Sequence, residues 1–164
     1  MSDPLSERLL SAVQTQLATI RKTAGYKTDA GQSVYRARRA VDVFPSIVIW
    51  EAEEIVSNRM DAMTGSQYTL SFNVEGWVTA DQDETGRMLG LIRADIKICL
   101  MRWFYNGQAV DPEASASRVN KGFGSIEYQG SSPASREAGS DAEGVTTRFT
   151  ATFVEKIGDP YVSD

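Results

Sequence analysis

The sequence contains no histidine, and Cys99 is its only cysteine. The absence of histidine excludes Ser-His and Cys-His catalytic pairs, histidine-based zinc sites and the usual proton shuttle near neutral pH. A single cysteine cannot form an internal disulfide. Because Cys99 falls on the apolar face of a predicted helix, it is interpreted as a small core residue, with a catalytic thiol as the alternative.

Several marks of other protein classes are also missing. No run of about 20 apolar residues could span a bilayer, and the N-terminal segment lacks the basic-then-apolar order of a signal peptide. We therefore expect a soluble protein made in the cytoplasm. Neither a Walker pattern nor a GxGxxG after a strand occurs. The net charge of −5 argues against duplex nucleic acid as a general partner, because phosphate binding needs a positive field.

The most strongly patterned stretch runs from Tyr68 to Trp103. Apolar and polar residues alternate from Tyr68 to Val78, which predicts a strand with one side on a core. From Asp83 onwards, apolar residues recur at spacings of three and four, which predicts an amphipathic helix lying on the sheet. Gly86 and Gly90 leave a smooth patch on this helix, where we expect another backbone to approach closely.

The remaining patterns predict one further helix and several strands. A helix is predicted with Asp3 as its N-cap and Pro4 at its first position, and its apolar residues face inward up to Ile20. Strands are predicted at 34–40, 47–50, 125–128 and 145–154, and the Ser-, Gly- and charge-rich segment 129–144 is predicted to be a flexible loop. The chain is thus expected to be a single α+β domain over residues 1–164. Its sheet should be mixed but mainly antiparallel, with four to five strands, two helices packed on it and long loops.

Two charged patches fall on neighbouring predicted strands. They consist of Arg36, Arg38 and Arg39, and of Glu51, Glu53 and Glu54. One interpretation is cross-strand pairing of opposite charges within the chain. The other is that the patches meet across a subunit boundary, where complementary charges fix register. Glu51 and Glu53 would share one side of a strand, as an acid/base pair might, although alternating acids at a strand end are typical of a solvated or interface face.

Three stretches carry a resemblance to a known family. They are the opening helix with LLSAVQTQLATI, the pairing of YTLSFNVEGWVT with DETGRMLGLIRADIKICLM, and the closing SREAGSDAEGVTTRFTATFVEKIGDP. In their order along nearly the whole chain they resemble the tail terminator, or tail completion, proteins of long-tailed bacteriophages.

The resemblance implies a structural virion protein without catalytic residues, metal or cofactor. Such a protein forms a homo-oligomeric ring, a hexamer, that caps the tail tube, ends tube polymerisation and offers a surface for head joining. Its implied partners are the tail tube protein and the head-tail connector protein, and DNA passes through the lumen without specific binding. The implied location is the virion tail, assembled in the host cytoplasm, with no membrane contact.

Segment 129–144 is the expected contact with tube or connector. Its candidate residues are Ser131, Ser132, Arg136, Glu137, Asp141 and Glu143. Another head-tail connector or neck component is the nearest alternative function, and a non-catalytic peptide-binding module is a further one. A carboxylate-based hydrolase would require Glu51, Glu53 or Asp83 to lie in a concave pocket with a shifted pKa.

Overall fold

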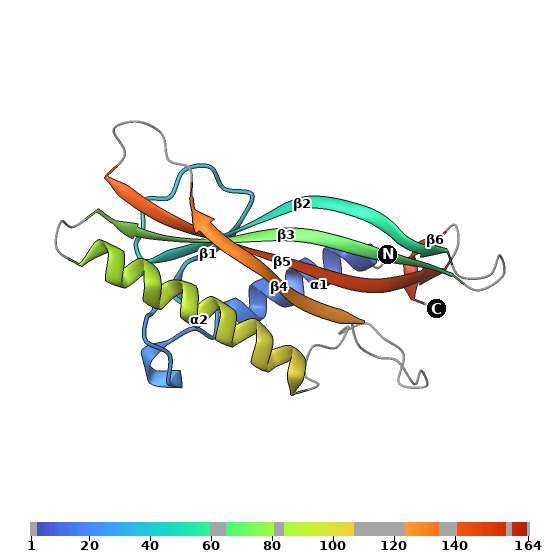
Figure 1. Cartoon of the computed structure of the whole chain (residues 1–164), viewed down its shortest axis with the longest axis horizontal. Coiled ribbons are helices and arrows are strands. Elements are labelled where there is room, and N and C mark those ends of the chain that lie inside the picture. Colours follow the sequence, from blue (N-terminus) through green and yellow to red (C-terminus); the bar gives the residue numbers. More distant parts are fainter. Residues whose placement is uncertain are drawn as a thin grey trace.

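The computed structural model describes residues 3–59, 65–80, 84–106, 124–134, 141–156 and 159–163. Within these residues it forms an α+β fold with two α-helices on a mixed, mainly antiparallel sheet, as the sequence predicts (Figure 1). The elements in chain order are α1 (Leu5–Leu17), the 3-10 helices η1 (Lys22–Ala24) and η2 (Ala30–Gln32), β1 (Val34–Arg36), β2 (Ser46–Arg59), β3 (Ser66–Thr79), α2 (Thr85–Tyr105), β4 (Ser125–Pro133), β5 (Ala142–Lys156) and β6 (Asp159–Ser163).

The strands follow the order β1-β2-β3-β5-β4, and β6 pairs with the end of β5. β1 is parallel to β2, whereas every other pair is antiparallel. Phe72 in the middle of β3 lies opposite Glu51 of β2 and Phe149 of β5. Residues opposite each other in a ladder point to the same face of the sheet. The register therefore assigns side chains to two faces, one packed against the helices and one directed away from them.

Both helices cover the same face. Ile92 and Ile96 of α2 pack directly over Gly76 of β3, where even a Cβ would collide with Ile92. Ser6 of α1 hydrogen-bonds Glu54, which shares its face with Leu70. The core between the layers contains the helix stripe that the sequence predicts and the inward strand residues; it includes Leu9, Val13, Leu17, Ile47, Ile49, Leu70, Phe72, Val74, Ile92, Ile96, Cys99, Trp103, Phe149 and Ala151.

Several strand boundaries differ from the prediction. The strand expected at 34–40 ends at Arg36, because Ala37 has a positive φ of 50°. β2 continues to Arg59, well past the predicted apolar run 47–50, since the glutamates pair along β3 as readily as apolar residues do. A strand held by backbone hydrogen bonds can thus continue through residues whose polar side chains do not predict a strand.

The predicted flexible loop 129–144 is wrong at both ends. Residues 129–133 belong to β4 and residues 142–144 to β5, and the ladder between these strands reaches from Ser125 to Pro133. Backbone hydrogen bonds with a neighbouring strand outweigh the weak strand preference of Ser and Gly. The connection shrinks to residues 134–141, of which 135–140 lie outside the described residues.

Two predictions about the helices also change. Pro4, not Asp3, is the N-cap of α1. A Cβ added at Gly86 or Gly90 would have nothing within 4 Å, so no described backbone approaches the start of α2 closely. Asp83 lies outside the described residues.

Candidate functional site

The most distinctive surfaces of the molecule are the two edges of its sheet. β1 pairs with β2 only at Ile47, Val48 and Ile49. Beyond that point, no strand of the described part pairs with the outer side of residues 50–59. At the opposite edge, β4 pairs with β5 alone among the described strands. An unpaired strand edge presents a row of backbone donors and acceptors that can template another strand.

The β2 edge is acidic on both faces. A register shift lies between Glu51 and Glu53, so Glu51 and Glu54 share the helix face while Glu53, opposite Ser71, points to the other face. The expectation that Glu51 and Glu53 share one side of a strand is therefore wrong, because the irregularity interrupts the alternation. Among the described side chains, none forms an ion pair with Glu51 or Glu53. Both side chains are exposed.

Acidic groups also gather where β2 and β5 meet the beginning of α1. Partial burial of its carboxylate raises the pKa of Glu54, the charge of Glu51 raises it further, and a hydrogen bond with Ser6 partly offsets both effects. Burial, followed by the charges of Glu54 and Asp159, raises the pKa of Glu155 to about 7. The described residues contain no group of three or more acidic, Cys or His side chains placed to hold a metal ion.

The arginines lie beside this acidic edge but bond elsewhere. The guanidinium of Arg36 forms a two-point ion pair with Glu7 of α1, and its Nη2 lies 3.1 Å from Glu7 Oε2. Arg38 lies 3.3 Å from Asp42 and stacks over the ring of Tyr35. The predicted cross-strand pairing with the β2 glutamates is therefore wrong within one chain. The physical reason is the parallel register, which places Arg36 beside Ile49 and before the first glutamate.

A small apolar patch on the same edge was not predicted from the sequence. Ile55 and Val56 are 47% and 49% exposed, on opposite faces of β2. They follow directly after the glutamates. Adjacent apolar residues exposed on both faces of an unpaired strand are typical of a segment that another strand can cover.

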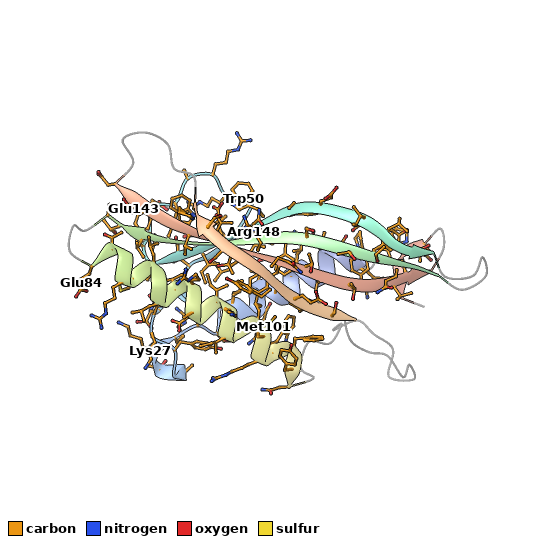
Figure 2. All side chains as sticks on the ribbon, in the orientation of Figure 1. Lys27, Trp50, Glu84, Met101, Glu143 and Arg148 are labelled. Atoms are coloured by element: carbon orange, nitrogen blue, oxygen red, sulfur yellow. The ribbon has the colours of Figure 1, made fainter. Side chains whose placement is uncertain are left out.

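The β4 edge is flanked by cations on both faces. On the helix face, the ammonium of Lys97 in α2 lies 4.4 Å from the centre of the Tyr128 ring. On the other face, Arg148 of β5 lies opposite Gly130 and donates a hydrogen bond to Ser132 at 3.4 Å. Figure 2 labels Arg148 on the sheet and Glu84 at the beginning of α2.

Of the residues predicted to contact the tube or connector, some lie in or next to strands and others lie outside the described residues. Ser131 and Ser132 lie in β4, Asp141 immediately precedes β5, and Glu143 lies within it. Arg136 and Glu137 lie outside the described residues.

Comparison with known proteins does not identify a family for this chain. No protein-family model matches the chain, and a search of curated proteins finds no match either. Neither helix in the described residues has the combination of length and hydropathy that crossing a membrane requires.

Proposed function

We propose that this chain is a structural virion protein: a phage tail terminator whose copies form a ring that caps the tail tube, ends its polymerisation and provides the surface for head joining. The observation that carries the proposal is the pair of sheet edges that no other described strand covers, acidic along β2 and flanked by cations along β4. Proteins that stay monomeric usually cover or shorten such edges. Two different edges on one chain suit head-to-tail contacts, which close into a ring when the rotation permits.

Catalysis has no part in this proposal. The acidic residues at the β2 edge are exposed and lie on both faces, an arrangement suited to contact with another surface. A ring protein works through shape and mutual fit, and its partners are the tube protein below and the connector protein above. We infer that the connection between β4 and β5, which includes Arg136 and Glu137, faces one of these partners, together with the described Asp141 and Glu143.

The test is assembly with and without the chain. Deleting its gene from a phage that encodes it should produce overlong tubes and unjoined heads in negative-stain images, because nothing then stops the tube. The purified chain should have the mass of a ring, a hexamer, and should bind one end of isolated tubes. Tails of normal length joined to heads without the chain would contradict the proposal.

A peptide-binding module is the second candidate, and exposed Ile55 and Val56 on an open edge are the observation that favours it. Such modules add an extended peptide to a sheet edge through backbone hydrogen bonds. A module of this kind would remain monomeric at all concentrations and gain thermal stability only with its peptide. A different connector or neck component would also form a ring but would occupy another position in the virion.

A further inference from the structure

We propose that the β2 edge of one copy, residues 50–59, pairs with the β4 edge of a second copy, Ser125–Pro133, so that the sheets join into one. This inference rests on the proposed ring-forming function, because it names the two surfaces through which the copies meet. The occupant of each edge is therefore another molecule of the same chain. The argument has three steps: strand direction, charge and the exposed apolar residues.

The directions of the strands permit this pairing, because the antiparallel order of the sheet continues across the contact. β2 is antiparallel to β3, β3 to β5 and β5 to β4, so β4 runs antiparallel to β2. A second copy placed with its helices on the same side brings its β2 antiparallel to the first copy's β4. The new ladder continues the alternation of the existing one. The two unpaired segments are also of similar length.

Charge selects this pairing over a symmetric one. In the joined sheet, Glu51 and Glu54 lie on the helix face with Lys97, and Glu53 lies on the other face with Arg148. Lys97 of α2 and Arg148 of β5 reach β4 with their side chains, at Tyr128 and Ser132, so each lies on the same face as the opposite charge of the incoming strand. Glu127, the acid that the described β4 carries, lies close to Gln129 of the same strand, whose amide nitrogen is 3.5 Å from its carboxylate.

A two-fold pairing of β2 with β2 over residues 50–59 would set the glutamates of each copy against residues 55–59 of the other copy. The described cations that flank β4, Lys97 and Arg148, would then take no part in the contact. The two arginines that precede β2 are already paired within the chain, Arg36 with Glu7 and Arg38 with Asp42. The head-to-tail arrangement brings the glutamates to the cations of β4, and it leaves one β2 edge and one β4 edge without a partner until the ring closes.

The exposed apolar residues fit the same arrangement. Val56 lies on the helix face, as the ring of Tyr128 does, while Ile55 lies on the opposite face. A neighbouring β4 beside residues 50–59 would therefore cover part of both side chains. The half-exposed state of Ile55 and Val56 in the single chain then has a physical reason, since burying apolar area favours association.

The experiment uses charge reversal in the full chain, with mass measured by light scattering over a concentration series. The β4-edge variant is K97E/R148E, and the β2-edge variant is E51K/E53K. Each alone should associate at least roughly tenfold more weakly than the wild type, because each places like charges at every contact. Mixing the two variants should restore assembly, because acidic β2 then meets basic β4 and basic β2 meets acidic β4.

The matched control is K22E/R87E, which reverses two cations outside both edges. Their side chains are 63% and 74% exposed, so the control should assemble as the wild type does. Circular dichroism of every variant establishes that the fold is kept. If K97E/R148E assembled normally while E51K/E53K did not, the β4 edge would take no part in the contact and the inference would be wrong. A monomeric wild type, or a mixture that stays dissociated, would also overturn it.

The outcome separates this inference from the proposed function. If both variants still form the ring, the edge pairing is wrong, but a terminator that assembles through other contacts is still possible. If assembly depends on the two edges but the ring does not bind tail tubes, the edge pairing is correct and the terminator function is wrong.

Discussion

The carboxylate of Asp95 on α2 accepts two hydrogen bonds from Thr28, one from its backbone N–H and one from its hydroxyl, both at 2.8 Å. The backbone N–H of Lys27 approaches the same carboxylate at 3.0 Å. Asp95 is buried, and these donors replace the water that it loses. The contact fixes the segment between η1 and η2 onto the helix layer.

Replacing Asp95 with asparagine should therefore destabilise the fold by about 1–2 kcal/mol, because an amide oxygen accepts these bonds without the negative charge that strengthens them, and the NH2 group comes to lie against the backbone N–H of Lys27. Urea unfolding measures the change. D29N is the control: Asp29 accepts one backbone N–H from Lys22 at a partly exposed position, so its loss should cost less than about 1 kcal/mol. Equal midpoints for D95N and the wild type would contradict the structural role.

Glycine at position 76 allows α2 to approach the sheet. G76A should destabilise the fold by about 1–3 kcal/mol, since the added Cβ collides with the side chain of Ile92. In the G76A background, I92A should cost less than it does in the wild type, because it removes the collision. A double-mutant cycle on unfolding free energies tests this coupling, and additive effects would refute it.

Replacing a glycine in α2 should raise the stability of the fold, in contrast to G76A. A side chain at Gly90 would meet nothing within 4 Å. G90A should therefore stabilise the fold by up to about 1 kcal/mol, through the higher helix preference of alanine. Thermal unfolding measures it. A loss of stability would indicate that a second molecule or an undescribed segment packs against this turn.

Glu155 should make stability depend on pH near neutrality. Its pKa in the folded chain is raised to about 7 by burial and by the charges of Glu54 and Asp159. The folded state thus binds the proton more tightly than the unfolded state does. The resulting stabilisation is complete below the unfolded pKa of about 4.3 and is lost as pH rises through 7.

Unfolding free energies at pH 5 and pH 8 should therefore differ for the wild type, by an amount on the order of 1 kcal/mol after allowance for solvent screening. E155Q removes the titrating group and should flatten this part of the profile. E127Q, at an exposed strand position, is the control and should leave the profile unchanged. An identical pH profile for E155Q and the wild type would exclude Glu155 as the source.

The ion pair between Arg36 and Glu7 predicts a local effect of charge reversal. R36E should lower stability by up to about 1 kcal/mol, because it sets two carboxylates side by side where β1 meets α1. The swap R36E/E7R should recover most of the loss. If R36E instead weakened assembly without changing monomer stability, Arg36 would belong to a subunit contact.

The fold was predictable wherever one side of an element meets the core. The alternation in β3 and the stripe from Ile92 to Trp103 in α2 correspond to buried residues, because burial imposes its period on the sequence. Strand ends were not predictable. β2 beyond Trp50 and β4 beyond Tyr128 are held by backbone ladders, which leave no apolar signature in exposed glutamates or serines.

The candidate site was predictable in composition but not in geometry. The acidic patch was recognisable from Glu51, Glu53 and Glu54. Their division between two faces depends on a register shift, which the residue types in this segment do not predict. Arg36 was recognised as a partner for acids, but its actual partner lies in α1, far away in sequence. Lys97 and Arg148 were missed, because only the folded chain brings a helix and a strand to the same edge.

The single cysteine gives this protein a built-in reporter. The thiol of Cys99 is fully buried between the helices, where it donates to the backbone oxygen of Gln16 at 3.3 Å. A thiol reagent can reach it only after α1 separates from α2. The labelling rate of the unmodified chain therefore records how often the helix layer opens, and it can be measured in the free subunit and in any assembly.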